Sequence, residues 1–296
     1  MQYCLDNRAA RQHRPGTSRW MLLLLVALPA CVTRNAPPSP AVDTTAMSRI
    51  PSGTFVMGTD SSEIASLLAR YETDHADLFT GEVPRHTVRV DAFALDRTEV
   101  TTARFRGFLI ARPEWQRDRL SPASHNGRYL DGWTGTAYAA GMGQRPVTFI
   151  TLPAAAAYCA WRGTRLPTEV EWEYAARGGL VSAEFPWGDA PPDTTRVNYG
   201  ASHIGAPVDV GRYPPNGYGL FDMAGNVWEY TADRWDVDSA SLSTRARAEG
   251  PGTRYVIRGG SYGASPINLR VRYRDSHPSG GAGPHVGFRS AKSQVP

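Results

Sequence analysis

The second half of the chain limits the possible folds most, because turns containing Gly or Pro interrupt every apolar run there. From Phe185 onward, turns and short strands alternate in the segments FPWGD, VNYG, PPNGYG, RYVIRGGSY and HVGFRS. Turn residues at this density, mixed with aromatic residues, are typical of loop-rich or β-containing folds. The chain of 296 residues holds 29 Gly, 23 Pro and 13 Tyr, so we expect an irregular fold rather than a helical bundle.

The first half of the chain predicts most of the regular elements. Residues 50–58 and 88–96 are expected to be strands, and the apolar spacing in 61–71 and 98–110 predicts helices. Residues 111–144 lack a clean period, so we expect a long surface loop there. Two further helices are predicted. One opens at Thr151 and ends at Gly163, and the other starts with a capping box of Thr168 and Glu171 and ends at Gly178.

The N-terminus predicts export. Residues 1–30 place four Arg before the apolar run MLLLLVALPA, which is the order of a secretory signal peptide and is too short to span a bilayer. The sequence Leu28-Pro29-Ala30-Cys31 resembles the lipobox of bacterial lipoproteins, which predicts lipidation of Cys31; a plain cleaved signal is the alternative. Residues 31–48 are then a Pro-rich tether and 49–296 the folded domain. We expect a periplasmic or cell-surface protein, held to the membrane as an outer-membrane lipoprotein.

Charge and cysteine content argue against a nucleic-acid-binding protein and against a disulfide-bonded protein. Without residues 1–30, which hold four Arg and one Asp, the formal charge falls from +4 to +1, so nothing in the charge supports a nucleic-acid partner. Beyond Cys31 the mature chain has only Cys159, which lies in the apolar run AYCAW. We therefore expect no disulfide, and Cys159 is interpreted as a small buried hydrophobic residue rather than a reactive thiol.

The stretch GLFDMAGNVWEY (219–230) places Asp222 and Glu229 among large apolar residues. Burial of a carboxylate carries a desolvation penalty unless a positive group meets it. The stretch therefore predicts either a bound cation or a buried ion pair.

A set of ordered motifs identifies a family. The chain resembles the formylglycine-generating enzyme (sulfatase-modifying factor) family over about residues 50–292, through RLPTE (165–169), EWEYAARGG (171–179), PWG (186–188), NGYGL (216–220), GNVWE (225–229), RGGSY (258–262) and GFR (287–289). The resemblance implies a single domain with an irregular, C-type-lectin-like α+β fold.

The resemblance also implies structural calcium. Family members bind calcium at the positions of Asp222 and Glu229 through side chains and at Gly225 and Val227 through main-chain carbonyls, a mixture of oxygens that suits this ion. The alternative is that the two acids cap turns or pair with an arginine such as Arg234. A second family site corresponds to Asn198 and Tyr199, although its downstream acidic element is missing or replaced by Asp209.

The implied chemistry is where this sequence departs from the family. The enzymes bind Cu(I) through two cysteines that follow Gly-Gly-Ser-Tyr, and these positions hold Ala264 and Leu269 here. Neither side chain ligates copper, so we do not expect this cofactor. In the family, the resemblance also implies a disulfide between the position of Cys159 and a second cysteine. Ser290 occupies the position of that second cysteine here. The histidines show no metal-binding spacing, although His277 and His285 can converge beside the altered site.

The residues that match the family's substrate groove remain. They are Ser261, Tyr262, Asn268, Arg270 and Arg272. Arg270, Arg272 and Arg274 alternate, which predicts one face of an extended segment that either binds an anionic or peptide ligand or is a solvated strand face.

We therefore expect a binding or accessory module without formylglycine-generating activity, whose ligand is a peptide, protein or glycan. The alternative is an oxidase of the formylglycine-generating or nonheme metal type with a changed active site. A cluster of His, Asp or Glu side chains beneath residues 261–274 would favour that alternative.

Overall fold

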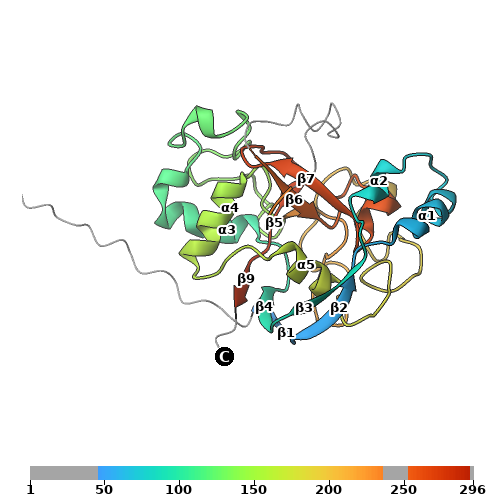
Figure 1. The fold of residues 1–296 in the computed structure, drawn as a ribbon. Coiled ribbons are helices and arrows are strands. Elements are labelled where there is room, and N and C mark those ends of the chain that lie inside the picture. The colour runs from blue at the N-terminus through green and yellow to red at the C-terminus, as the bar shows by residue number, and fades with distance from the viewer. Residues whose placement is uncertain (1–45, 236–252, 294–296) are drawn as a thin grey trace, which may run out of the picture. The chain divides into compact units, whose positions relative to one another are not determined.

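The computed structural model describes residues 46–235 and 253–293. The predicted signal peptide, Cys31 and most of the predicted tether lie outside these ranges. The described residues form a mixed α+β fold in which short strands and helices are joined by long loops (Figure 1). The fold class expected from the sequence is confirmed.

The first part of the chain alternates short strands with short helices. Its elements are β1 (Met47–Ile50), β2 (Gly53–Met57), η2 (Ser61–Glu63), α1 (Ile64–Arg70), α2 (Asp77–Thr80), β3 (His86–Val90), β4 (Phe93–Asp96), α3 (Thr102–Ala111), η3 (Pro113–Trp115), η4 (Pro122–Ser124), α4 (Leu152–Trp161) and α5 (Glu169–Ala176).

Long loops dominate the second part of the chain, as its turn residues predict. The elements are η5 (Gly200–Ser202), β5 (Trp228–Arg234), β6 (Arg254–Arg258), η7 (Pro266–Leu269), β7 (Arg274–Pro278), β8 (Val286–Gly287) and β9 (Ala291–Ser293).

Three small sheets organise the described residues. The largest has the strand order β7-β6-β5-β8, in which β5 and β8 are parallel and the other pairs are antiparallel. In a second sheet, β1-β4-β9, the central strand β4 pairs with both the first and the last described strand, and β2 pairs with β3. Figure 1 shows α3 and α4 to one side of the largest sheet and α1 and α2 to the other.

The two strand predictions were too long. Pro51 and Ser52 separate β1 from β2, and the chain turns again between Val90 and Phe93. The registers explain this break, because Val90 pairs with Gly53 whereas Phe93 pairs with Ile50. Both chain segments thus pass together from one sheet to another, and one continuous strand over 88–96 could not satisfy both pairings.

The helix predictions agree better with the structure. The Thr168 side chain accepts from the Glu171 N–H and the Glu171 side chain accepts from the Thr168 N–H, so the capping box of α5 is confirmed. The helix α4 follows the Thr151 cap as expected. By contrast, α3 begins only at Thr102, because the Thr101 hydroxyl accepts from Arg104 N–H and fixes the start.

Two apolar clusters form most of the core. One joins α3 and α4 to the large sheet, where the rings of Phe105, Tyr158 and Phe288 pack within 6.3 Å of each other. The other surrounds the fully buried Trp172 of α5 and includes Phe93 and Leu220. Within the described ranges, no helix combines the length and apolar character needed to cross a membrane.

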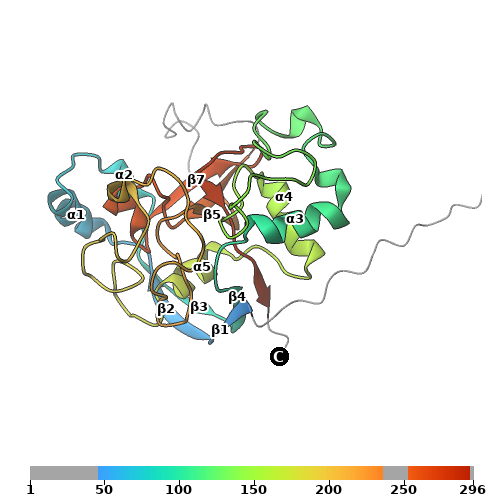
Figure 2. The ribbon, with the colours of Figure 1, turned by 180° about the vertical axis from the view of Figure 1, so that it is seen from behind.

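The loops between α5 and β5 position the remaining features. Figure 2 shows these loops, in yellow and orange, beside α1 and α2. Glu184 in this region accepts hydrogen bonds from Arg70 and Tyr71 at the end of α1. The loops are therefore tied to the N-terminal part of the domain by charged contacts.

Candidate functional site

Two cavities border the short helix η7. Of the predicted groove residues, Ser261 and Asn268 line one cavity of about 260 Å³, Arg270 and Arg272 line another of about 780 Å³, and Tyr262 lines neither of the two. We call the first the histidine cavity, whose polar lining includes Ser261, Asn268, Asp275, Ser276, His277 and His285. The second is the arginine pocket, which is described below.

Both histidines line the histidine cavity, a point that the sequence left open. Tyr230 Oη lies 2.6 Å from His277 Nδ1, and the Tyr262 ring lies 4.7 Å from the His285 ring. Burial, with a contribution from the nearby positive charge of Arg254, lowers the pKa of His277 to about 4. His277 is therefore neutral at physiological pH and can exchange hydrogen bonds without carrying charge.

The altered family positions are apolar in the structure as well as in the sequence. Ala264 and Leu269 are buried and pack in one cluster with Phe185 and Val197. A soft metal such as Cu(I) prefers thiolate or thioether ligands, and neither residue supplies one. In the described part of the chain, no group of three or more His, Cys, Asp or Glu side chains is placed to hold a metal. The residues here do not fit copper.

The expected alternating row of arginines was wrong. The Tyr273 N–H bonds to the Arg270 carbonyl in a turn, so the chain is not extended until Arg274 opens β7. Each arginine of the row pairs with an acid from a distant segment: Arg270 with Glu82, Arg272 with Glu63, and Arg274 with Glu169. The spacing in the sequence could not reveal these partners, because they lie more than 100 residues away.

The predicted calcium loops lie against one another. The Asn226 N–H donates to the Asn198 carbonyl at 2.9 Å, and a Cβ on Gly225 would lie 2.3 Å from that same oxygen. Asp222, Gly225 and Asn226 all have positive φ, which explains the Asp, Gly and Asn in this turn. The Asn198 Oδ1 atom is buried without a hydrogen-bond partner among the described residues, whereas Asp209 is exposed.

An arginine meets Glu229. Arg289 Nε and Nη2 each donate to one carboxylate oxygen at 2.7 Å, and Trp172 Nε1 donates at 2.9 Å. Both charged residues are fully buried. The partner is thus Arg289 of the GFR motif, and Arg234 is exposed at the end of β5. Sequence reasoning quoted this motif but missed its role, since 60 residues separate the pair.

Two further carboxyls share this buried region. Glu99, which was missed, accepts from Asn226 Nδ2 at 3.0 Å, and its Oε2 has no partner among the described residues. Asp222 Oδ2 accepts from the Gly211 N–H. Burial raises the pKa of Asp222 to about 6, and burial together with the Asp222 charge raises the pKa of Glu99 well above its usual value. Three carboxyls therefore surround the single guanidinium of Arg289.

Cys159 is a core residue as predicted. It is completely buried, and burial raises the pKa of its thiol well above the usual range. Ser290, at the position of the family's second cysteine, donates its hydroxyl to Asp96 Oδ2 at 2.6 Å and accepts from Arg162. This polar network occupies the position where the family has the second thiol.

The loop-rich α+β fold, the motifs and the altered cavity beside η7 define a protein of the formylglycine-generating type. Residues 32–294 match the family described as sulfatase-modifying factor enzyme 1-like domain. The chain belongs to this family.

Relatives in the family include both active and inactive proteins. The chain is 31% identical to the formylglycine-generating enzyme of Bos taurus over 88% of this chain and 77% of that protein. It is 33% identical to the inactive C-alpha-formylglycine-generating enzyme 2 of Mus musculus over 84% and 86% of the two chains. Among solved structures, PvdO from Pseudomonas aeruginosa matches with a TM-score of 0.60 and 25% identity, covering 84% of this chain and 94% of PvdO.

Proposed function

We propose that this chain is a binding or accessory member of its family that does not generate formylglycine. The observation that carries the proposal is the burial of Ala264 and Leu269 in an apolar cluster at the two positions where the enzymes have copper thiolates. A relative named as inactive, with similar identity over similar coverage, supports a role of the same fold without the activity.

The histidine cavity is the proposed binding site for a peptide, protein or glycan ligand. Ser261, Asn268 and the neutral His277 supply hydrogen-bonding groups, and Trp228 supplies an apolar wall. Ligand-binding sites are usually concave, with polar groups placed to fix the orientation of the ligand. At about 260 Å³ the cavity accepts one side chain or one sugar ring rather than a whole ligand.

The test is direct. Purified protein is incubated with Cu(I), oxygen and a cysteine-containing sulfatase peptide, and the aldehyde product is measured by mass spectrometry. We expect no aldehyde. A formylglycine-generating enzyme from a relative serves as the positive control, and the variant carrying both Ala264→Cys and Leu269→Cys asks whether thiols alone restore activity. Aldehyde formation by the unaltered chain would overturn the proposal.

We also propose that calcium stabilises the domain. Asp222 and Glu229 together carry more negative charge than Arg289 offsets, and a divalent cation would compensate the excess. Asp222, Glu229 and the carbonyls of Gly225 and Val227 would hold such an ion. The unpartnered Asn198 Oδ1 supports a second ion beside Tyr199.

Export and lipid anchoring through Cys31 are proposed from the sequence. The charged and apolar pattern of residues 1–30 and the lipobox-like sequence before Cys31 support both steps. The proposed location is the periplasmic or outer surface of a bacterial outer membrane.

An enzyme with a changed active site is the second candidate. Asp275, His277 and His285 line the same cavity as Ser261 and Asn268, which supports this alternative, although no three such side chains among the described residues are placed to hold a metal. Metal analysis of the purified protein distinguishes the two functions. Stoichiometric iron or copper would favour catalysis, whereas calcium without a redox metal would favour binding.

A further inference from the structure

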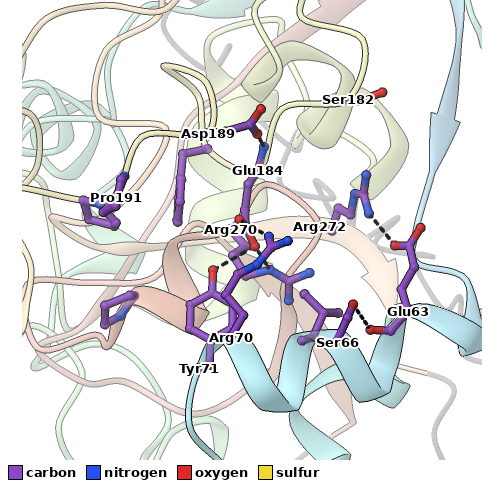
Figure 3. A pocket seen from close by; sticks show the side chains of 14 residues that line it. Glu63, Ser66, Arg70, Tyr71, Ser182, Glu184, Asp189, Pro191, Arg270 and Arg272 are labelled. Carbon is purple, nitrogen blue, oxygen red and sulfur yellow. Dashed lines mark hydrogen bonds and ion pairs between the residues drawn. The ribbon is translucent and has the colours of Figure 1, made fainter.

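The arginine pocket is separate from the cavity assigned above, and Arg270 and Arg272 of the predicted substrate groove line it. It has a volume of about 780 Å³, in the range of sites that bind drug-sized ligands. Figure 3 shows α1 along one side of the pocket, with Glu184 and Asp189 from the loop after α5 opposite it and Arg270 between them. Leu67, Phe185 and Pro266 add apolar walls.

Two of the three acids that line this pocket, Glu63 and Glu184, are already paired with arginines. Glu184 accepts from Arg70 Nη1 at 2.8 Å, from Tyr71 Oη at 2.8 Å and from Arg270 Nε at 3.1 Å. Glu63 pairs with Arg272 and with Arg85. These carboxylates hold arginines in place and offer little further attraction to a cationic ligand.

Donors, by contrast, remain available. The Arg70 side chain is 59% exposed and is fixed through one nitrogen of its guanidinium. The Arg272 side chain lines the pocket, is 18% exposed and donates to Glu63 through Nη1, while its Nε atom is buried. Acids therefore orient both guanidiniums at the pocket wall, where their remaining N–H groups suit a planar carboxylate.

We propose that the arginine pocket binds an acidic peptide segment. A carboxylate of the segment would meet Arg70 and Arg272, and its backbone would lie along the proline-bearing wall. Asp189, exposed at the edge, is the lining acid that pairs with no arginine among the described residues; it accepts from the Glu184 N–H. Its charge limits the pocket to ligands that place their acids toward Arg70 and Arg272.

Calorimetric titration with a capped tetrapeptide of Asp and Glu tests the inference. We expect binding that weakens as salt rises, and about tenfold weaker binding for the matched peptide of Asn and Gln. Arg70→Gln should weaken binding about tenfold, and so should Arg272→Lys, which keeps the charge but removes the planar guanidinium. The control is Arg89→Gln, which alters an exposed arginine of β3 outside the pocket.

Three outcomes would overturn the inference: no binding of the acidic peptide, equal binding of the amide peptide, or equal loss of affinity in Arg89→Gln. Inorganic sulfate in place of the peptide tests for a general anion site, and equal affinity for sulfate would also refute peptide recognition. Thermal melts of each variant show that the fold is retained. The result is independent of the proposed function, which is judged by aldehyde formation and not by peptide affinity.

Discussion

Arg289 donates to both carboxylate oxygens of Glu229 at 2.7 Å, and both side chains are fully buried. The pair joins β5 to the segment before β9, and Arg289 also donates to the carbonyls of Asp96 and Phe221. The buried guanidinium of Arg289 thus bonds to three other chain segments, at Asp96, Phe221 and Glu229.

Removing the charge of Glu229 should therefore cost much of the stability. Glu229→Gln leaves the buried Arg289 without its main counter-charge, and we expect a loss of about 3 kcal/mol in the free energy of unfolding. Urea denaturation measures it. The matched control is Glu114→Gln, which breaks an exposed ion pair with Arg112 and should cost about 0.5 kcal/mol. Similar losses for the two variants would contradict the assigned role.

Calcium binding predicts a chelator effect. Adding chelator should lower the melting temperature of the unaltered protein, because a ligand that binds only the folded state stabilises it. Asp222→Asn keeps an acceptor for the Gly211 N–H but removes charge, and its melting temperature should not respond to chelator. If the unaltered protein melts at the same temperature with and without chelator, the calcium proposal fails.

His277 predicts loss of stability in acid. The pKa of His277 is about 4 in the fold, whereas the pKa of a His in the unfolded chain is near its ordinary value of 6.5. Above pH 6.5 both states are neutral and this term is constant. Between pH 6.5 and 4 only the unfolded state takes up the proton, so stability falls by about 3 kcal/mol as an upper figure.

The comparison with His277→Gln isolates this effect. Asp222, with a pKa of about 6 in the fold, acts in the opposite direction, because the folded state binds its proton first as pH falls. Subtracting the stability curve of the variant removes the Asp222 contribution. A difference that stays flat between pH 6.5 and 4 would show that His277 is not held neutral.

A lipid anchor on Cys31 predicts that the cell fraction containing the protein depends on this residue. Cys31→Ser removes the sulfur that would carry the lipid, so the protein should move from the membrane fraction to the soluble fraction after cell lysis. Immunoblots of the two fractions measure the change. Retention of the variant in the membrane fraction would refute the anchor.

The sequence predicted elements that depend on neighbouring residues. The capping box of α5 needs only Thr168 and Glu171, and its hydrogen bonds form as expected. The sequence left open whether His277 and His285 converge beside the altered site, and both line the histidine cavity in the structure. Local spacing was sufficient for the capping box alone.

Long-range pairings were not predicted. The alternation of Arg270, Arg272 and Arg274 suggested an exposed row, yet each residue pairs with an acid far away in the chain. For the same reason, the sequence suggested the nearby Arg234 as the partner of Glu229, whereas the structure pairs Glu229 with Arg289. A single sequence does not show which acid and which base form an ion pair, because the fold brings the two side chains together.

The helix η7 borders both cavities, with Asn268 on one and Pro266 on the other. Leu269, the last residue of η7, is buried in the core. One short segment of backbone therefore forms part of the rim of both cavities. A ligand in one cavity that displaces η7 would change the shape of the other cavity. Cooperativity between the two sites would then be reciprocal, with each ligand altering the affinity for its counterpart by the same factor.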